Sequence, residues 1–152
     1  MEKQPKVLFL STGNSTRSQM AEGFLRVIAG DRFIAASAGI EAGSLNPIAA
    51  EVMKEVGIDI SPQQSKDLTQ LLKDDFRYVI TVSDSARERA PIFPSTTHLL
   101  HWNLIDPALA HGTDEDIKEA FRRVRDDIRV KIHYFVDETF EKGKAVAQGT
   151  QE

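Results

Sequence analysis

The pattern of apolar and polar positions divides the chain into strand-like and helix-like segments that alternate. The segment 6–10 carries a continuous apolar run with β-branched and aromatic members, which is typical of a strand buried on both faces of a parallel sheet. Similar short runs predict strands at 33–38 and 78–82, and a fourth within THLLHW, residues 97–102. These four segments are the predicted strands of one sheet.

Between the strands, apolar side chains recur at the spacing of one helical face. Helices are predicted at 18–30, from Pro47 to Gly57, at 67–73, and from 114 to about 140. Ser18 and Asn46 are the expected N-caps of the first two, and Gly30 and Gly57 mark their ends. The last residues, 141–152, are predicted to form a flexible tail.

Strands that alternate with helices predict an α/β fold, in which right-handed crossovers place helices on both faces of a parallel sheet. In such folds, ligands bind beyond the carboxyl ends of the strands. A chain of 152 residues is sufficient for one domain that buries roughly two thirds of its unfolded surface. We therefore expect a single domain over residues 1–140.

Composition narrows the classes of function. The net charge is −4, so the sequence lacks the basic patch typical of nucleic-acid binding. No apolar run approaches the roughly 18 residues of a membrane-spanning helix, and the N-terminus does not resemble a secretory signal. A cytoplasmic protein is expected, with no membrane or nucleic-acid partner. The absence of cysteine excludes disulfides, thiolate metal sites and thiol redox chemistry within this chain.

The loop after the first strand, S-T-G-N-S-T-R-S, has the residue types of an anion site. Gly13 and Asn14 tolerate positive φ, so successive amides can point inward, and the following helix adds its positive end. Arg17 can supply two parallel donors to one oxyanion. The alternative is a polar turn that caps a helix, with Arg17 solvated. The predicted oxyanion-binding residues are Ser11, Thr12, Gly13, Asn14, Ser15, Thr16, Arg17 and Ser18.

The loop resembles the C-x5-R-S motif of the low-molecular-weight protein tyrosine phosphatase superfamily. More narrowly, it is similar to the thioredoxin-coupled arsenate reductases, which read C-T-G-N-S-C-R-S-Q-M-A-E-G. The resemblance continues in SAGIEAGSLNPIAAEVMKEVGIDIS, in VITVSDSARERAPIFP and in HWNLIDPALAHGTDEDIKEAFRRVRDDI. It implies a flavodoxin-like three-layer sandwich with a four-stranded parallel sheet.

All the thiol positions of that family are changed here. The nucleophilic cysteine is replaced by Ser11 and the second loop cysteine by Thr16, while the two cysteines that relay a disulfide to thioredoxin correspond to Ser83 and Ala90. A serine hydroxyl needs a general base, and no histidine or carboxylate lies nearby in sequence. We expect Ser11 to keep the shape of the loop without thiol-based turnover, which makes a thioredoxin partner doubtful.

Asp106, in IDPALAHG, stands where the resemblance places the general acid that protonates a leaving oxygen. The alternative is an Asp-Pro turn placed for folding. If the anion site is intact, Asp106 should border it, and repulsion would favour a protonated Asp106 or a monoanionic ligand.

Some members of the family bind potassium near the loop through residues that correspond to Asn14, Glu22 and Ser37, together with an aspartate. At the aspartate position this chain has Lys66, with Asp67 adjacent. The ammonium of Lys66 is expected to replace the cation and to pair with Glu22. No metal site and no cofactor are predicted.

Other candidate residues have structural explanations. His98 and His101 flank the fourth predicted strand and are expected to pack, and His111 and His133 are expected at the surface. The run RRVRDDIR, 122–129, mixes both charges and predicts a solvated helix face with i,i+4 pairs. Two further residues, Tyr134 and Phe135, are expected to pack in the last helix.

Three functions remain open. The first is an oxyanion-binding homologue without turnover, with phosphate, arsenate, sulfate or a phosphorylated molecule as ligand. The second is a working enzyme, either a weak phosphatase that uses Ser11 or a reductase that recruits an external thiol. The third is an engineered cysteine-free form of an active arsenate reductase, whose biology would be arsenic detoxification.

Overall fold

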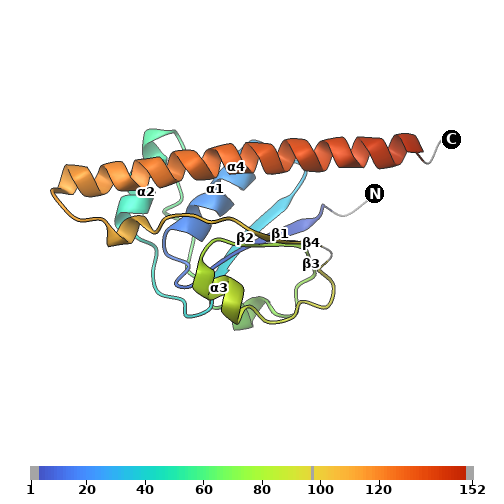
Figure 1. The fold of residues 1–152 in the computed structure, drawn as a ribbon, viewed down its shortest axis with the longest axis horizontal. Helices are drawn as coiled ribbons and strands as arrows, with labels where there is room; N and C mark the ends of the chain where they lie inside the picture. The colour runs from blue at the N-terminus through green and yellow to red at the C-terminus, as the bar shows by residue number, and fades with distance from the viewer. Residues whose placement is uncertain (1–3, 97, 150–152) are drawn as a thin grey trace.

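The parallel sheet predicted from the apolar runs is present. The structure is a computed structural model that describes residues 4–96 and 98–149. Its sheet has the order β2-β1-β3-β4, and each neighbouring pair is parallel (Figure 1). The strands are β1 (Lys6–Ser11), β2 (Ile34–Gly39), β3 (Phe76–Thr81) and β4 (His98–His101). Since β1 lies inside the sheet, its carboxyl end is flanked on both sides.

Helices cover both faces of the sheet, as the alternating pattern predicts. The elements are α1 (Arg17–Ala29), α2 (Pro47–Glu55), α3 (Asp84–Arg89), α4 (Asp114–Gly149) and the short 3-10 helices η1 (Leu68–Leu71) and η2 (Pro107–Leu109). Figure 1 shows α1, α2 and α4 on one side of the sheet and α3 on the other. The fold is a three-layer α/β sandwich.

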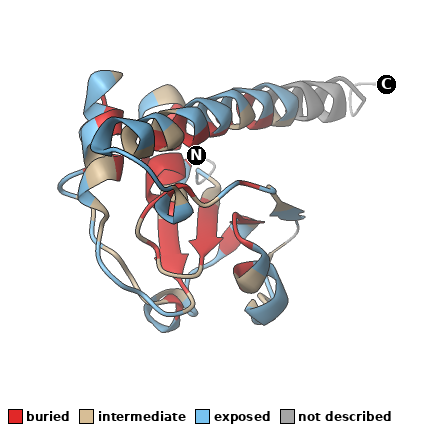
Figure 2. Ribbon diagram, turned by 60° about the vertical axis from the view of Figure 1, so that its left-hand side comes forward, coloured by how far each residue is buried: buried red, intermediate tan, exposed pale blue. Residues whose placement is uncertain are grey.

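Two apolar clusters hold these layers together. Alternate residues of β1 serve different clusters: Phe9 packs with α1 and α4, whereas Leu8 packs on the opposite face with Phe76 and Ala86. Both β1 side chains are fully buried, and Figure 2 shows buried strands in the centre of the molecule, while β4 at the edge of the sheet is mostly exposed. A strand with two buried faces explains the continuous apolar run at 6–10.

The predicted ends of the helices are partly wrong. Asn46 caps α2, because its Oδ1 accepts the Ile48 amide at 2.8 Å, and Gly57 has a φ of +82° just beyond that helix. Ser18 is not an N-cap, since α1 begins at Arg17 and its N-cap is Thr16. The Ser18 hydroxyl is instead held within the preceding loop.

Three other helical segments differ from the pattern. Only Leu68–Leu71 of the segment 67–73 is helical, as a 3-10 turn capped by Asp67. The helix α3 was not predicted, because its six residues, DSARER, carry almost no apolar periodicity. The predicted end of the last helix near residue 140 is also wrong, since α4 continues to Gly149.

The predicted flexible tail therefore overlaps α4, and residues 150–152 lie outside the described part of the chain. Flexibility of the tail and the domain limits stay predictions. Across residues 4–96 and 98–149, no helix is long and apolar enough to cross a membrane. A cytoplasmic location also stays a prediction from the sequence.

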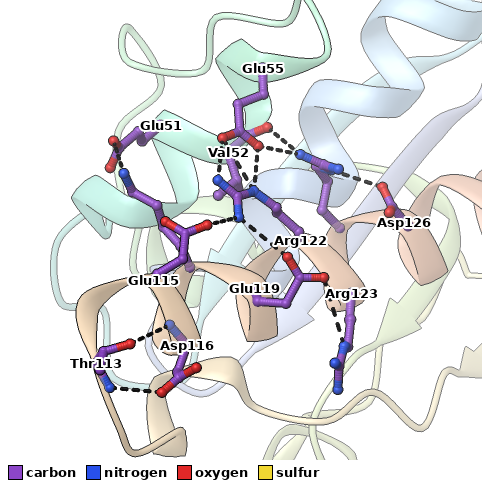
Figure 3. Close-up of polar contacts among 12 residues, drawn as sticks. Glu51, Val52, Glu55, Thr113, Glu115, Asp116, Glu119, Arg122, Arg123 and Asp126 are labelled. Carbon is purple, nitrogen blue, oxygen red and sulfur yellow. Dashed lines mark hydrogen bonds and ion pairs between the residues drawn. The ribbon is translucent and has the colours of Figure 1, made fainter.

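The run RRVRDDIR is not solvated along its whole length, because part of it contacts α2. Arg125 is only 8% exposed, and its Nη1 donates to the Val52 carbonyl and to Glu55 Oε1, both at 2.9 Å. Arg122 reaches the same carboxylate, with Nη2 at 2.9 Å from Glu55 Oε2 (Figure 3). We call Glu55, Arg122 and Arg125 the α2–α4 clamp. The solvated-face prediction is wrong for Arg125.

Of the remaining predictions about packing and exposure, one is wrong and the others are confirmed. Tyr134 is 73% exposed, so its predicted packing is wrong, whereas Phe135 is buried against the rings of Phe33 and Tyr78. Exposure of His111 and His133 is confirmed.

Candidate oxyanion site

The loop between β1 and α1 is held along its outer side by the segment after β2. Amides of that segment donate to loop carbonyls, which directs these carbonyls away from the inner side of the loop. The pairs are Ile40 with Ser11 at 3.1 Å, Glu41 with Thr12 at 2.8 Å, Gly43 with Gly13 at 2.9 Å and Asn46 with Ser15 at 2.9 Å. Curvature of this kind lets successive amides face a common anion.

Two backbone features permit this close pairing. A Cβ at Gly39 would lie 2.8 Å from the Thr12 carbonyl oxygen and 2.9 Å from the Asn14 amide nitrogen. Asn14 has a φ of +52°, in the left-handed region that asparagine tolerates. The conformation of Asn14 agrees with the sequence prediction, but the need for Gly39 was missed. Its only signal is a glycine at the end of a strand, opposite the loop.

Asn14 is the buried centre of the loop's hydrogen bonds. Its Nδ2 donates to Ser18 Oγ at 2.8 Å, and its Oδ1 accepts the Lys66 amide at 2.8 Å. Its carbonyl accepts from Gln19 Nε2 at 3.0 Å and from Ser65 Oγ at 2.6 Å. The loop is therefore shaped by contacts to α1 and to residues 65–66, of which the sequence analysis placed Lys66 near the loop but missed Ser65.

Ser11 is also held by the loop. Its Oγ accepts the Asn14 amide at 2.9 Å and lies 2.7 Å from Ser18 Oγ. In the described part of the chain, neither of these contacts brings a carboxylate or imidazole to the hydroxyl. The two hydrogen-bond partners of the Ser11 hydroxyl are thus a serine hydroxyl and a backbone amide.

Arg17 is half-buried, with its side chain 14% exposed. Its Nη1 donates to the Leu104 carbonyl at 3.1 Å, and its Nη2 lies 3.6 Å from Asp106 Oδ2. Burial lowers the pKa of Arg17, while Asp106 and Asp84 act in the opposite direction; the guanidinium nevertheless stays charged near neutral pH. An arginine held in this way does not fit the alternative interpretation, in which it is solvated.

Asp106 combines the two roles considered for it. Its Oδ1 accepts the Ala108 amide at 3.0 Å and so caps η2, as an Asp-Pro turn would. Its other oxygen faces Arg17. Asp106 thus lies next to Arg17, while its place at the border of an anion site and its role as an acid stay predictions.

The two former relay positions are separated by α3. Ser83 Oγ lies 3.1 Å from Thr12 Oγ1 and accepts the Ala86 amide, so it joins the loop to the start of α3. Ala90 follows the other end of that helix and packs in the smaller core cluster.

The histidines beside this region have structural contacts. His101 Nδ1 lies 2.7 Å from Thr81 Oγ1, and its Nε2 lies 3.3 Å from Asp84 Oδ1. His98 stacks on Tyr78 with ring centroids 4.8 Å apart. The packing role predicted for both is confirmed.

Lys66 pairs with Glu22 as predicted, with Nζ 3.8 Å from Oε1. The buried Glu22 also accepts from Ser37 Oγ at 2.8 Å and from Arg26 Nη1 at 3.2 Å. Two cations and a hydroxyl therefore surround this carboxylate. Within residues 4–96 and 98–149, no group of three or more histidines and carboxylates could hold a metal; the absence of a metal stays a prediction.

Comparison with known proteins gives consistent matches. The family described as low molecular weight phosphotyrosine protein phosphatase matches residues 6–146. An arsenate reductase of Halalkalibacterium halodurans is 47% identical over 131 residues, covering 86% of this chain and 94% of the relative. An arsenate reductase of Bacillus subtilis is 44% identical over the same shares.

A solved structure described as an arsenate reductase in the phosphate binding state superposes with a TM-score of 0.76. It shares 32% sequence identity and covers 88% of this chain and 98% of its own.

Proposed function

The chain belongs to the low molecular weight phosphotyrosine protein phosphatase family, and from this premise we propose that it binds a tetrahedral oxyanion in the loop 11–18. The ligand is phosphate, arsenate or sulfate, or the phosphoryl group of a larger molecule. Binding occurs without thiol-based turnover, and neither a cofactor nor thioredoxin takes part.

One observation carries the proposal. The loop's carbonyls are occupied by amides of the segment 40–46, while Arg17 has one hydrogen bond and a carboxylate at 3.6 Å. A positive, donor-rich site at a helix N-terminus is complementary to an oxyanion. The arsenate reductase described in the phosphate binding state has the same fold, which supports this choice of ligand.

The proposed lack of turnover rests on the residues at the thiol positions. A thiolate beside an arginine and a helix N-terminus is both the nucleophile and a negative charge. The hydroxyl of Ser11 is neutral and bonded within the loop. Its presence removes the nucleophile and also the repulsion that a thiolate would exert on a bound anion.

Calorimetry with sulfate, phosphate and arsenate tests this function. Wild type should bind, and Arg17→Ala should weaken binding about 100-fold or more, because two charge-assisted donors are lost. Arg123→Ala is the matched control, since Arg123 lies on α4 with its side chain 80% exposed, and it should bind like wild type. Absence of binding by wild type, or equal binding by Arg17→Ala, contradicts the proposal.

The same samples test turnover. Wild type should hydrolyse an aryl phosphate no faster than Arg17→Ala, with no covalent phosphate at Ser11. Arsenate reduction in the presence of thioredoxin or glutathione should not exceed the rate without protein. Hydrolysis that depends on Arg17 would instead support the weak-phosphatase alternative.

A second candidate, arsenate reduction by a cysteine-containing form, is favoured by the contact between Ser83 and Thr12 at 3.1 Å. That contact keeps the first relay position next to the loop. Cysteine introduced together at positions 11, 83 and 90 should then give thioredoxin-dependent reduction if the thiols were removed by engineering. Continued inactivity of this variant favours natural divergence.

A further inference from the structure

The loop contains one buried hydroxyl without a partner. Thr16 is 4% exposed, and within residues 4–96 and 98–149 its Oγ1 has no hydrogen bond. The other buried hydroxyls of the loop, Ser11 and Ser18, are bonded to each other and to Asn14. Since buried hydroxyls in folded proteins are nearly always paired, the state of Thr16 needs an explanation.

The usual local partner is not used. Thr16 is the N-cap of α1, where a threonine hydroxyl normally accepts an amide of the first turn. Here φ is −129° and ψ is −77°, and the side chain makes no capping bond. Its carbonyl does start the helix, accepting the Met20 amide at 2.9 Å. The Thr16 hydroxyl therefore makes no hydrogen bond to the amides of the first turn of α1.

A ligand that accepts hydrogen bonds would satisfy both groups. Arginine side chains and backbone amides only donate, so the site offers donors and lacks an acceptor for the Thr16 proton. An oxyanion oxygen supplies that acceptor, whereas another donor does not. The ligand atom that pairs with the Thr16 proton must therefore be able to accept a hydrogen bond, as the oxygens of an oxyanion do.

We propose that Thr16 contacts the ligand and that its hydroxyl donates a hydrogen bond to the bound oxyanion. This rests on the proposed function, and it assigns a binding role to the side chain at a position that otherwise contributes only its backbone. The competing explanation is a buried water held by Thr16, which would make the hydroxyl part of the folded structure alone. The two explanations predict opposite effects of removing it.

Thr16→Val, which replaces the hydroxyl with a methyl of similar size, separates them. Calorimetry with sulfate, which carries no proton near neutral pH, should show binding about tenfold weaker than wild type. Thermal unfolding without sulfate should be unchanged or shifted upward, because an unpaired buried donor is gone. Thr16→Ser keeps the hydroxyl and should restore most of the affinity.

Thr139→Val is the matched control. Its hydroxyl donates to the Phe135 carbonyl within α4, away from the loop, so sulfate should bind it like wild type. Wild-type affinity in Thr16→Val, together with a lower unfolding temperature, would overturn the proposal in favour of a structural hydroxyl. Losses of affinity and stability that Thr16→Ser does not restore would assign the effect to the methyl group and also overturn it.

Arg17→Ala in the same experiment distinguishes the two levels of failure. When wild type binds sulfate and Arg17→Ala does not, the site exists, and only the role of Thr16 depends on the valine result. When wild type does not bind, the oxyanion function fails and the role of Thr16 fails with it.

Discussion

Two arginines, Arg17 and Arg125, are withdrawn from solvent in this protein, but their partners differ. Arg125 donates to the Val52 carbonyl, to Glu55 and to Asp126, each at 2.9 Å. Among the described residues, the Arg17 side chain has one hydrogen bond, to the Leu104 carbonyl, and one ion pair, with Asp106 at 3.6 Å. Arg125 is therefore bonded to the fold on several sides, whereas Arg17 has fewer contacts of this kind, which is consistent with the proposed role of Arg17 in anion binding.

The pKa shifts of the charged groups also differ between the clamp and the loop. In the α2–α4 clamp, hydrogen bonds from Arg122 lower the pKa of Glu55 to about 2 and raise the pKa of Arg122. At the loop, burial lowers the pKa of Arg17, and Asp106 and Asp84 only oppose that effect. The compensated charges of the clamp join α2 to α4, whereas Arg17 is the cation to which we assign the proposed binding.

The largest expected effect comes from deforming the loop while all charges stay in place. Gly39→Ala places a Cβ 2.8 Å from the Thr12 carbonyl oxygen, so backbone must move. We expect a loss of about 2–4 kcal/mol in the free energy of unfolding and sulfate binding at least about tenfold weaker. Urea unfolding and calorimetry measure the two quantities.

Gly43→Ala is the control for that experiment. A Cβ there would lie 3.8 Å from the Gly13 carbonyl oxygen, an ordinary contact. Its stability should stay within about 0.5 kcal/mol of wild type. Full sulfate affinity in Gly39→Ala would show that the close approach does not shape the loop.

Arg125→Met comes next in size and separates the two regions. Loss of the guanidinium removes the donor to the Val52 carbonyl and one of the two arginines that bind Glu55, which keeps Arg122, so the free energy of unfolding should fall by about 2 kcal/mol. Sulfate affinity should not change, because these contacts join α2 to α4. Arg123→Met controls for loss of charge alone, and a sulfate affinity that falls with Arg125→Met would contradict the division.

The third prediction concerns the carboxylate beside Arg17. Asp106→Asn removes a negative charge 3.6 Å from Nη2 and should strengthen sulfate binding about three- to tenfold, since repulsion between the carboxylate and a dianion is lost. The gain should shrink at high ionic strength. Weaker binding in this variant would mean that Asp106 holds Arg17 in position for the anion.

The smallest effect is the pH dependence of the clamp. Because the pKa of Glu55 falls from its usual 4.5 to about 2, its contribution to stability is complete above pH 4.5 and is lost as pH falls towards 2. Solvent screening keeps the contribution modest. Thermal unfolding between pH 5 and 2 should show a shallower decline in Glu55→Gln, and identical slopes would contradict the assignment.

The sequence predicted those features whose causes are local. Residues 7–10 have the pattern of a buried strand because each of them faces one of two cores, and Asn46 caps α2 through neighbouring amides. Ser18 has a side chain that could cap a helix in the same way, but the shape of the loop places its hydroxyl 2.7 Å from Ser11 Oγ. The type of a residue therefore predicts which hydrogen bonds its side chain can make, but not which of them forms in the fold.

The candidate site shows the same limit. The polar loop, Arg17 and Asp106 could be identified from their order in the chain, whereas the contribution of Gly39 depends on a backbone approach from another strand. Arg125 looked solvated because charged residues surround it in sequence, and only the packing of α4 on α2 buries it. Pairing between distant segments therefore decides which arginine is fixed by the fold, as Arg125 is.

The most direct test compares unfolding temperatures of Arg17→Ala and Arg125→Met with and without sulfate, because a ligand that binds the folded state raises the unfolding temperature. Arg17→Ala should melt close to wild type without sulfate and gain nothing from its addition. Arg125→Met should melt lower and gain as much as wild type. The reverse pattern, with Arg17→Ala strongly destabilised yet still stabilised by sulfate, would contradict the account.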